Sequence, residues 1–142
     1  MTALIDTIAD ALVVSLNGAT FSQTFTATKS DLPEYELTDM GTLHVTVVPS
    51  KRRKTNATRG STQQECDIDI AVQKRYTEAT AQTERDLMKA LVDEIEDAVL
   101  RATHGGVTCI GIENDAPCGI EAFMRDLNQF TSVMTATYRR IA

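Results

Sequence analysis

The sequence predicts an α+β fold in a single domain, residues 1–142, with a mixed or antiparallel sheet and two helices packed against it. The 142 residues match the usual size of one domain, and no internal repeat or linker divides them. Several segments alternate apolar and polar residues as strands do, and two others repeat apolar residues at the helical period. Because strands follow one another without regular βαβ alternation, the order favours an α+β sheet over a parallel one.

The first expected helix covers 2–17, with Thr2 as its N-cap and Asn17-Gly18 as its stop. The next segment, 20–28, alternates Phe21 and Phe25 with polar residues and predicts a half-buried strand, which ends before Pro33.

Two clear strands are expected at 42–48 and 65–76, where β-branched residues alternate with polar ones. Pro49 is expected to end the first ladder. The segment 50–64 has no apolar side chain beyond Ala57, which predicts a projecting loop or the frayed tip of a long hairpin.

The longest helix is expected at 80–102, followed by a cap, a strand at 107–112, one or two helical turns at 119–127 and a closing strand at 129–140. The expected buried stripe of the 80–102 helix consists of Leu87, Leu91, Ile95 and Ala98, widened by Met88, Val92 and Val99. The expected cap is His104-Gly105-Gly106.

The charge is distributed unevenly along the chain. Fourteen basic and twenty acidic residues give a net charge of −6, yet 50–60 contains no acidic residue. Its basic residues are Lys51, Arg52, Arg53, Lys54 and Arg59, which leave the rest of the chain at −11. The basic segment is therefore the first feature that needs a function.

No motif predicts catalysis, a metal site or a cofactor. Asp67 and Asp69 alternate on one side of a strand, but neither a His nor a third carboxylate is near them in sequence. Cys118 has Glu113 and Asp115 nearby, but a thiol nucleophile also needs a base, and nothing in the sequence places His104 beside it. We therefore expect a protein that is not an enzyme and holds no metal or cofactor.

The remaining features predict location. No apolar stretch approaches the ~20 residues that span a bilayer. The first helix carries Asp6 and Asp10 and lacks a basic signal region, so we expect the protein on the cytoplasmic side, with Cys66, Cys109 and Cys118 as buried or semi-buried thiols.

Three uses of the basic segment stay open: contact with a protein, contact with nucleic acid, or an ordinary solvated loop. The segment lacks aromatic residues for base stacking and sits on an acidic chain, which favours a protein partner. In a homo-oligomer the long helix offers the complementary charge. The candidate acidic residues are Glu84, Asp93, Glu94, Glu96 and Asp97.

Three stretches together resemble the tail-terminator, or tail-completion, proteins of tailed bacteriophages. They are Asp31-Leu32-Pro33 leading into 42–49 (TLHVTVVP), 57–60 (ATRG) running into 67–74 (DIDIAVQK), and 130–133 (FTSV).

The resemblance implies a structural virion protein of the tail or neck that is assembled in the host cytoplasm. It would form a homo-oligomeric ring, commonly a hexamer, that caps the tail tube and joins it to the head-tail connector. Its partners would be other copies of itself, the tail tube protein and the connector or neck protein, with the sheath as a further candidate, and DNA would pass through the channel without specific binding. Another neck subunit, such as a head-completion or connector adaptor protein, is the alternative, and a nucleic-acid-binding protein is a more distant one.

Overall fold

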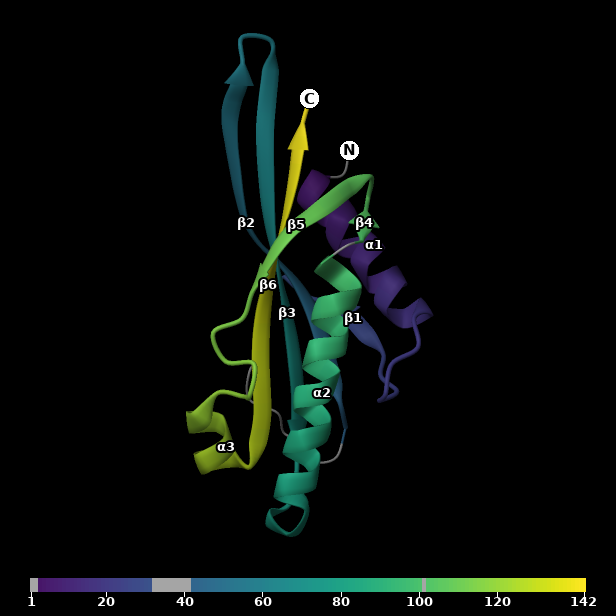
Figure 1. Cartoon of the computed structure of the whole chain (residues 1–142), viewed down its shortest axis with the longest axis vertical. Coiled ribbons are helices and arrows are strands. Elements are labelled where there is room, and N and C mark those ends of the chain that lie inside the picture. Colours follow the sequence, from purple (N-terminus) through teal and green to yellow (C-terminus); the bar gives the residue numbers. More distant parts are fainter. Residues whose placement is uncertain (1–2, 32–41, 101) are drawn as a thin grey trace.

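The computed structural model describes residues 3–31, 42–100 and 102–142. It contains a six-stranded mixed sheet in the order β1-β2-β3-β6-β5-β4, with helices beside it (Figure 1). Only β1 and β2 run parallel, and the other pairs are antiparallel. The predicted α+β class is confirmed.

Helix α1 (Leu4–Gly18) buries Ile8, Leu12 and Leu16, which recur on one face at helical spacing. It begins after Ala3, and the expected cap, Thr2, lies outside the described residues. The Asn17 side chain both accepts a hydrogen bond from the backbone N–H of Ala27 (2.7 Å) and donates one to its carbonyl (3.1 Å). These two hydrogen bonds connect the end of α1 to the first strand.

Strand β1 is only Ala27–Lys29, so the predicted strand over 20–28 is wrong for residues 20–26. The rings of Phe21 and Phe25 stack on each other at 5.4 Å and pack against the core from an irregular segment. Their spacing is the same as in a half-buried strand, but here the two rings pack on each other in a segment that is not a strand. The expected break at Pro33 lies outside the described residues.

Strands β2 (His44–Thr58) and β3 (Ser61–Arg75) pair along their whole length, down to Thr58 opposite Ser61. The polar segment 50–64 is therefore the paired end of a long β-hairpin. Pro49 does not end the ladder. Proline has no backbone N–H to donate, and a register shift between Pro49 and Lys51 accommodates it while the pairing continues on both sides. Beyond β1, which reaches only Val47, β2 has no described neighbour on its other side, so the proline leaves no strand unpaired there.

A short 3₁₀ turn, η1 (Glu78–Thr80), leads into α2 (Ala81–Leu100). The residues that α2 buries are Met88, Leu91, Val92, Ile95 and Val99. The predicted stripe is wrong at Leu87, which is 39% exposed, and at Ala98. The helix is rotated so that the Met88–Val92–Val99 side meets the sheet.

After α2 the chain forms β4 (Thr103–His104) and β5 (Val107–Glu113). Gly105 and Gly106 make the turn between them with φ of 61° and 77°, so the predicted helix cap is instead a hairpin turn. Gly105 also lies close to α1, because a Cβ there would come within 3.2 Å of the Thr7 methyl.

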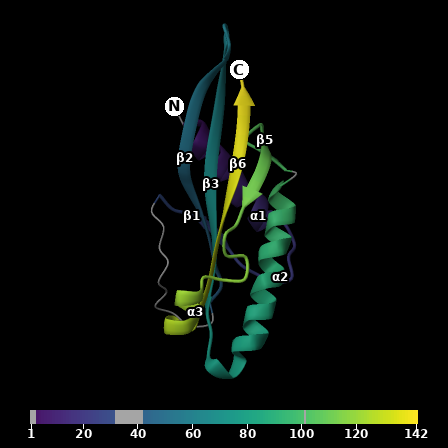
Figure 2. The same cartoon turned by 60° about the vertical axis from the view of Figure 1, so that its left-hand side comes forward.

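Helix α3 (Glu121–Leu127) precedes β6 (Gln129–Ile141), which lies between β3 and β5. Figures 1 and 2 show α3 at the lower end of the sheet, on the side away from α2. The strands β2, β3 and β6 continue upward past the helices.

The sheet has two different faces. Alternate residues such as Ile68, Ile70 and Met134 are buried against α1 and α2, and we call this side the helix face. The residues between them, including Asp67 and Thr135, point to the opposite side, which we call the open face.

Candidate interaction surfaces

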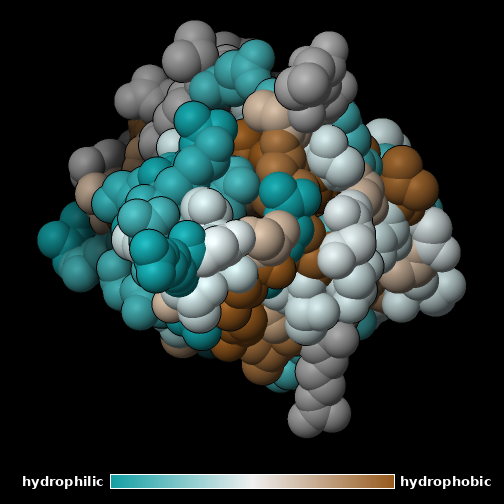
Figure 3. Space-filling view, turned by 90° about the horizontal axis from the view of Figure 1, so that it is seen from above, coloured by the Kyte–Doolittle hydropathy of each residue, from teal (hydrophilic) through white to brown (hydrophobic). Residues whose placement is uncertain are grey.

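The projecting end of the sheet is the most unusual part of the molecule. We call it the arm and define it as residues 50–65 of β2 and β3 together with 139–142 of β6. Gln63 pairs with Ile141, and Thr62 and Ala142 exchange backbone hydrogen bonds of 2.8 and 3.1 Å, so three strands reach almost to the tip. Every residue of β2 from Ser50 to Thr58 is exposed. Seen from above, the end of the arm is hydrophilic (Figure 3).

One of the five predicted contact residues, Arg53, forms ion pairs within its own chain. Arg53 binds Glu65 at 2.8 Å and Asp67 at 3.2 Å. Glu65 also binds Arg139 on β6 at 2.9 Å, so these side chains connect all three strands of the arm. The hydrogen bond to Glu65, helped by the charge of Asp67, raises the pKa of Arg53, and the bonds from Arg53 and Arg139 lower the pKa of Glu65. Arg53 therefore helps to hold the base of the arm.

The other four predicted residues, Lys51, Arg52, Lys54 and Arg59, form no ion pair with the described part of the chain. Sequence reasoning missed a fifth cation, Arg140, which lies opposite Gln64 on β6. Arg140 is 86 residues beyond Lys54, so no local sequence pattern predicts that it lies near the basic segment. The pairing of β3 with both β2 and β6 brings the two residues to the same end of the sheet.

The structure divides the predicted acidic residues of α2 into two groups. Glu84 binds Lys74 at 2.9 Å, Glu94 accepts hydrogen bonds from the backbone and hydroxyl of Ser22, and Glu96 accepts one from Asn114 at 3.1 Å. These carboxylates hold α2 to neighbouring segments of the same chain. Asp93 and Asp97 are exposed and have no partner in the described residues.

Asp67 and Asp69 are likewise used within the sheet. Thr137 donates to Asp67 at 2.9 Å and Thr135 donates to Asp69 at 2.7 Å. Among the residues that the structure places, no group of three or more His, Cys, Asp or Glu side chains could hold a metal ion.

The cysteine prediction is wrong at one position. Cys66 and Cys109 are buried, and burial raises the pKa of both thiols, whereas Cys118 is exposed. His104 is buried, and its Nδ1 lies 2.8 Å from the hydroxyl of Tyr138. It therefore serves an internal contact. No described helix has the length and apolarity needed to cross a membrane.

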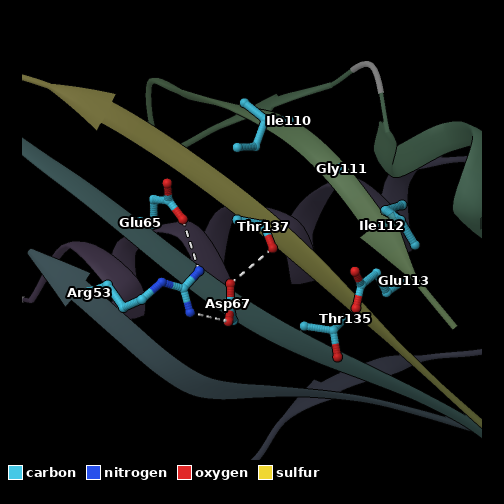
Figure 4. A pocket seen from close by; sticks show the side chains of 9 residues that line it. All are labelled: Arg53, Glu65, Asp67, Ile110, Gly111, Ile112, Glu113, Thr135 and Thr137. Carbon is cyan, nitrogen blue, oxygen red and sulfur yellow. Dashed lines mark hydrogen bonds and ion pairs between the residues drawn. The ribbon is translucent and has the colours of Figure 1, made fainter. Parts of the chain in front are cut away.

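A groove of ≈ 500 Å³ runs across the open face at the base of the arm (Figure 4). The residues that line it are Arg53, Glu65, Asp67, Ile110, Gly111, Ile112, Glu113, Thr135 and Thr137. A second hollow of ≈ 300 Å³ shares Glu113 and Thr135 with it and adds Asp115. In the sequence, Glu113 and Asp115 stand out only as neighbours of Cys118, and the groove depends on β5 lying beside β6, which no local pattern specifies.

These features define an α+β domain with a cationic arm and an acidic groove on the open face of its sheet. No protein-family model matches the sequence, and no curated protein matches it. Among solved structures, the chain is similar to one described as "Virion of native gene transfer agent (GTA) particle", with 15% identity and a TM-score of 0.50. The match covers 99% of this chain and 100% of that chain, and at this identity it concerns the fold.

Proposed function

We propose that the protein is a structural virion protein, a tail terminator that forms a homo-oligomeric and commonly hexameric ring. In this proposal it has no catalytic role and binds no cofactor. The ring caps the tail tube and joins it to the connector, and DNA passes through without specific binding. The fold supports this, because the similar chain belongs to a virion and matches over nearly the whole length of both.

The arm is the observation that carries the proposal. The arm extends three strands beyond the helices, and no side chain of its β2 part, residues 50–58, is buried. Its cations Lys51, Arg52, Lys54 and Arg59 have no ion-pair partner among the described residues. An extension that contributes little to the core and keeps its cations exposed is suited to contact with another protein. A ring requires this kind of surface, since each subunit must present two different, complementary patches to its neighbours.

The direct experiment is imaging and native mass measurement of the purified chain, alone and with growing tail tubes of the cognate tube protein. We expect rings, and we expect tube growth to stop when they are added. A monomer at every concentration, with no ring on the tubes, would exclude the proposal. Rings that form without stopping growth would favour another neck subunit instead.

Nucleic-acid binding is the remaining alternative for the arm. It predicts DNA affinity that falls steeply with salt and disappears when the four free cations are replaced by Gln. We expect negligible binding to duplex and single-stranded DNA even at low salt.

A further inference from the structure

Three exposed cations of the arm, Arg52, Lys54 and Arg140, lie on one side of the sheet, whereas Lys51 is opposite Asp67 and faces the other side. Lys54 pairs with Gln64, and Gln64 pairs with Arg140, so the three residues share one face of neighbouring strands. One row lower, Arg52 pairs with Cys66, whose side chain is buried on the helix face. Burial raises the pKa of the Cys66 thiol, and the hydrogen bond from Gln64 and the charges of Arg52 and Arg140 oppose that rise. Arg52, Lys54 and Arg140 therefore continue the helix face upward.

The acidic groove lies on the opposite side of the same sheet. Glu65, Asp67, Asp69 and Glu113 all project from the open face of β3 and β5, as the strand register requires. Three cations lie near them: Arg53 and Arg139 are both bound to Glu65, and Lys51 is opposite Asp67. Glu113 and Asp115 are exposed and have no ion pair in the described part of the chain, so the groove has uncompensated negative charge.

Complementary charges on opposite faces of one sheet cannot meet within a subunit. We propose that the helix face of the arm of one copy packs into the open-face groove of the next copy, with Arg52, Lys54 and Arg140 opposite Glu113 and Asp115. This inference rests on the proposed homo-oligomeric function and identifies the two surfaces that build the ring. The contact joins two different surfaces, so it is head-to-tail, the type of interface that closes into rings.

The groove fits this role better than the acidic side of α2, which the sequence suggested. Of the five candidate carboxylates on α2, only Asp93 and Asp97 are without a partner among the described residues, because Glu84, Glu94 and Glu96 bind residues of their own chain. The groove is concave, and it contains Ile110, which is 47% exposed at its rim and would be covered by the neighbour.

Charge reversal tests the contact directly. We expect R52E/K54E and E113K/D115K each to weaken self-association by about 100-fold, because each places like charges across the contact. Combining all four substitutions in one chain places acidic side chains at positions 52 and 54 opposite basic ones at positions 113 and 115 and leaves Arg140 unchanged, so it should restore most of the ring formation. An equimolar mixture of the two double variants should also assemble, in alternating order.

The matched control is D93K/D97K, which reverses the free charges of α2 and should assemble like the wild type. Sedimentation velocity reports the association state, and circular dichroism verifies that each variant is folded. If E113K/D115K assembles normally, or the folded fourfold variant stays monomeric, the contact is wrong while the proposed ring stands. If the wild-type chain itself never assembles, the proposed function fails first.

Discussion

The two ends of strands β2, β3 and β6 are stabilised in different ways. At the lower end Ile68, Ile70 and Met134 are fully buried against α1 and α2. In the arm most side chains of the same strands are exposed or partly exposed, Gln64 being buried, and the strands are held by the backbone ladder and by the Arg53–Glu65–Arg139 contacts. Continuous pairing from a buried sheet can therefore order a polar extension that would be marginal as an isolated hairpin. The difference separates residues that fold the chain from residues that are free to bind a partner.

Removing a core side chain should have the largest effect on stability. Ile68→Ala removes buried methyl groups of β3 from the hydrophobic core and should lower the free energy of unfolding by about 2–5 kcal/mol. Thr55→Ala, on an exposed position of the arm, should stay within about 0.5 kcal/mol of the wild type. Urea denaturation of both variants measures the contrast, and equal losses would show that the arm belongs to the core.

The same glycine substitution should have different effects in the two regions. Gly119 has a φ of 98°, and a Cβ there would lie 2.9 Å from the Phe130 ring, so Gly119→Ala should cost about 1–3 kcal/mol. Gly60, at the tip of the arm, has nothing within 4 Å of an added Cβ, and Gly60→Ala should be tolerated. Thermal melts of the pair would contradict this account if Gly60→Ala were the more damaging change.

The buried His104 should make the core, but not the arm, sensitive to acid. Burial lowers the pKa of His104 in the folded protein below the 6.5 of an ordinary His, so the unfolded chain binds the proton more readily. The stability from neutral His104 is present above about pH 6.5 and is lost as the pH falls through the lower folded value. Denaturant titrations at pH 7.5 and 5.5 should show that the free energy of unfolding of the wild type is lower at pH 5.5. The decrease should be smaller in His104→Gln.

Neutralising the free cations of the arm should have the smallest effect on folding. Replacing Lys51, Arg52, Lys54 and Arg59 by Gln removes no described ion pair, so the melting temperature of the monomer should change little. Arg53→Gln provides the contrast, because it breaks the bonds to Glu65 and Asp67 and should loosen the arm. Hydrogen exchange of the 51–65 amides distinguishes the two, since only Arg53→Gln should increase it.

The sequence predicted the buried parts of the fold better than the exposed parts, for a physical reason. Where one face of a strand is buried, as at 65–76, apolar and polar residues alternate and predict the strand. β2 beyond Pro49 is exposed on both sides, so its sequence has no such alternation. The same reason explains the candidate surfaces. Composition revealed the basic segment, but the engagement of Arg53, the contribution of Arg140 and the groove beside β5 all follow from long-range register.

The central claim is that the arm builds a ring of identical subunits. Native mass measurement of the wild-type chain and of the variant with Lys51, Arg52, Lys54 and Arg59 replaced by Gln tests it most directly. We predict a closed multiple of the 15.5 kDa subunit for the wild type and a folded 15.5 kDa monomer for the variant. A variant that assembles as fully as the wild type would contradict the claim, and so would a wild type that remains monomeric at every concentration.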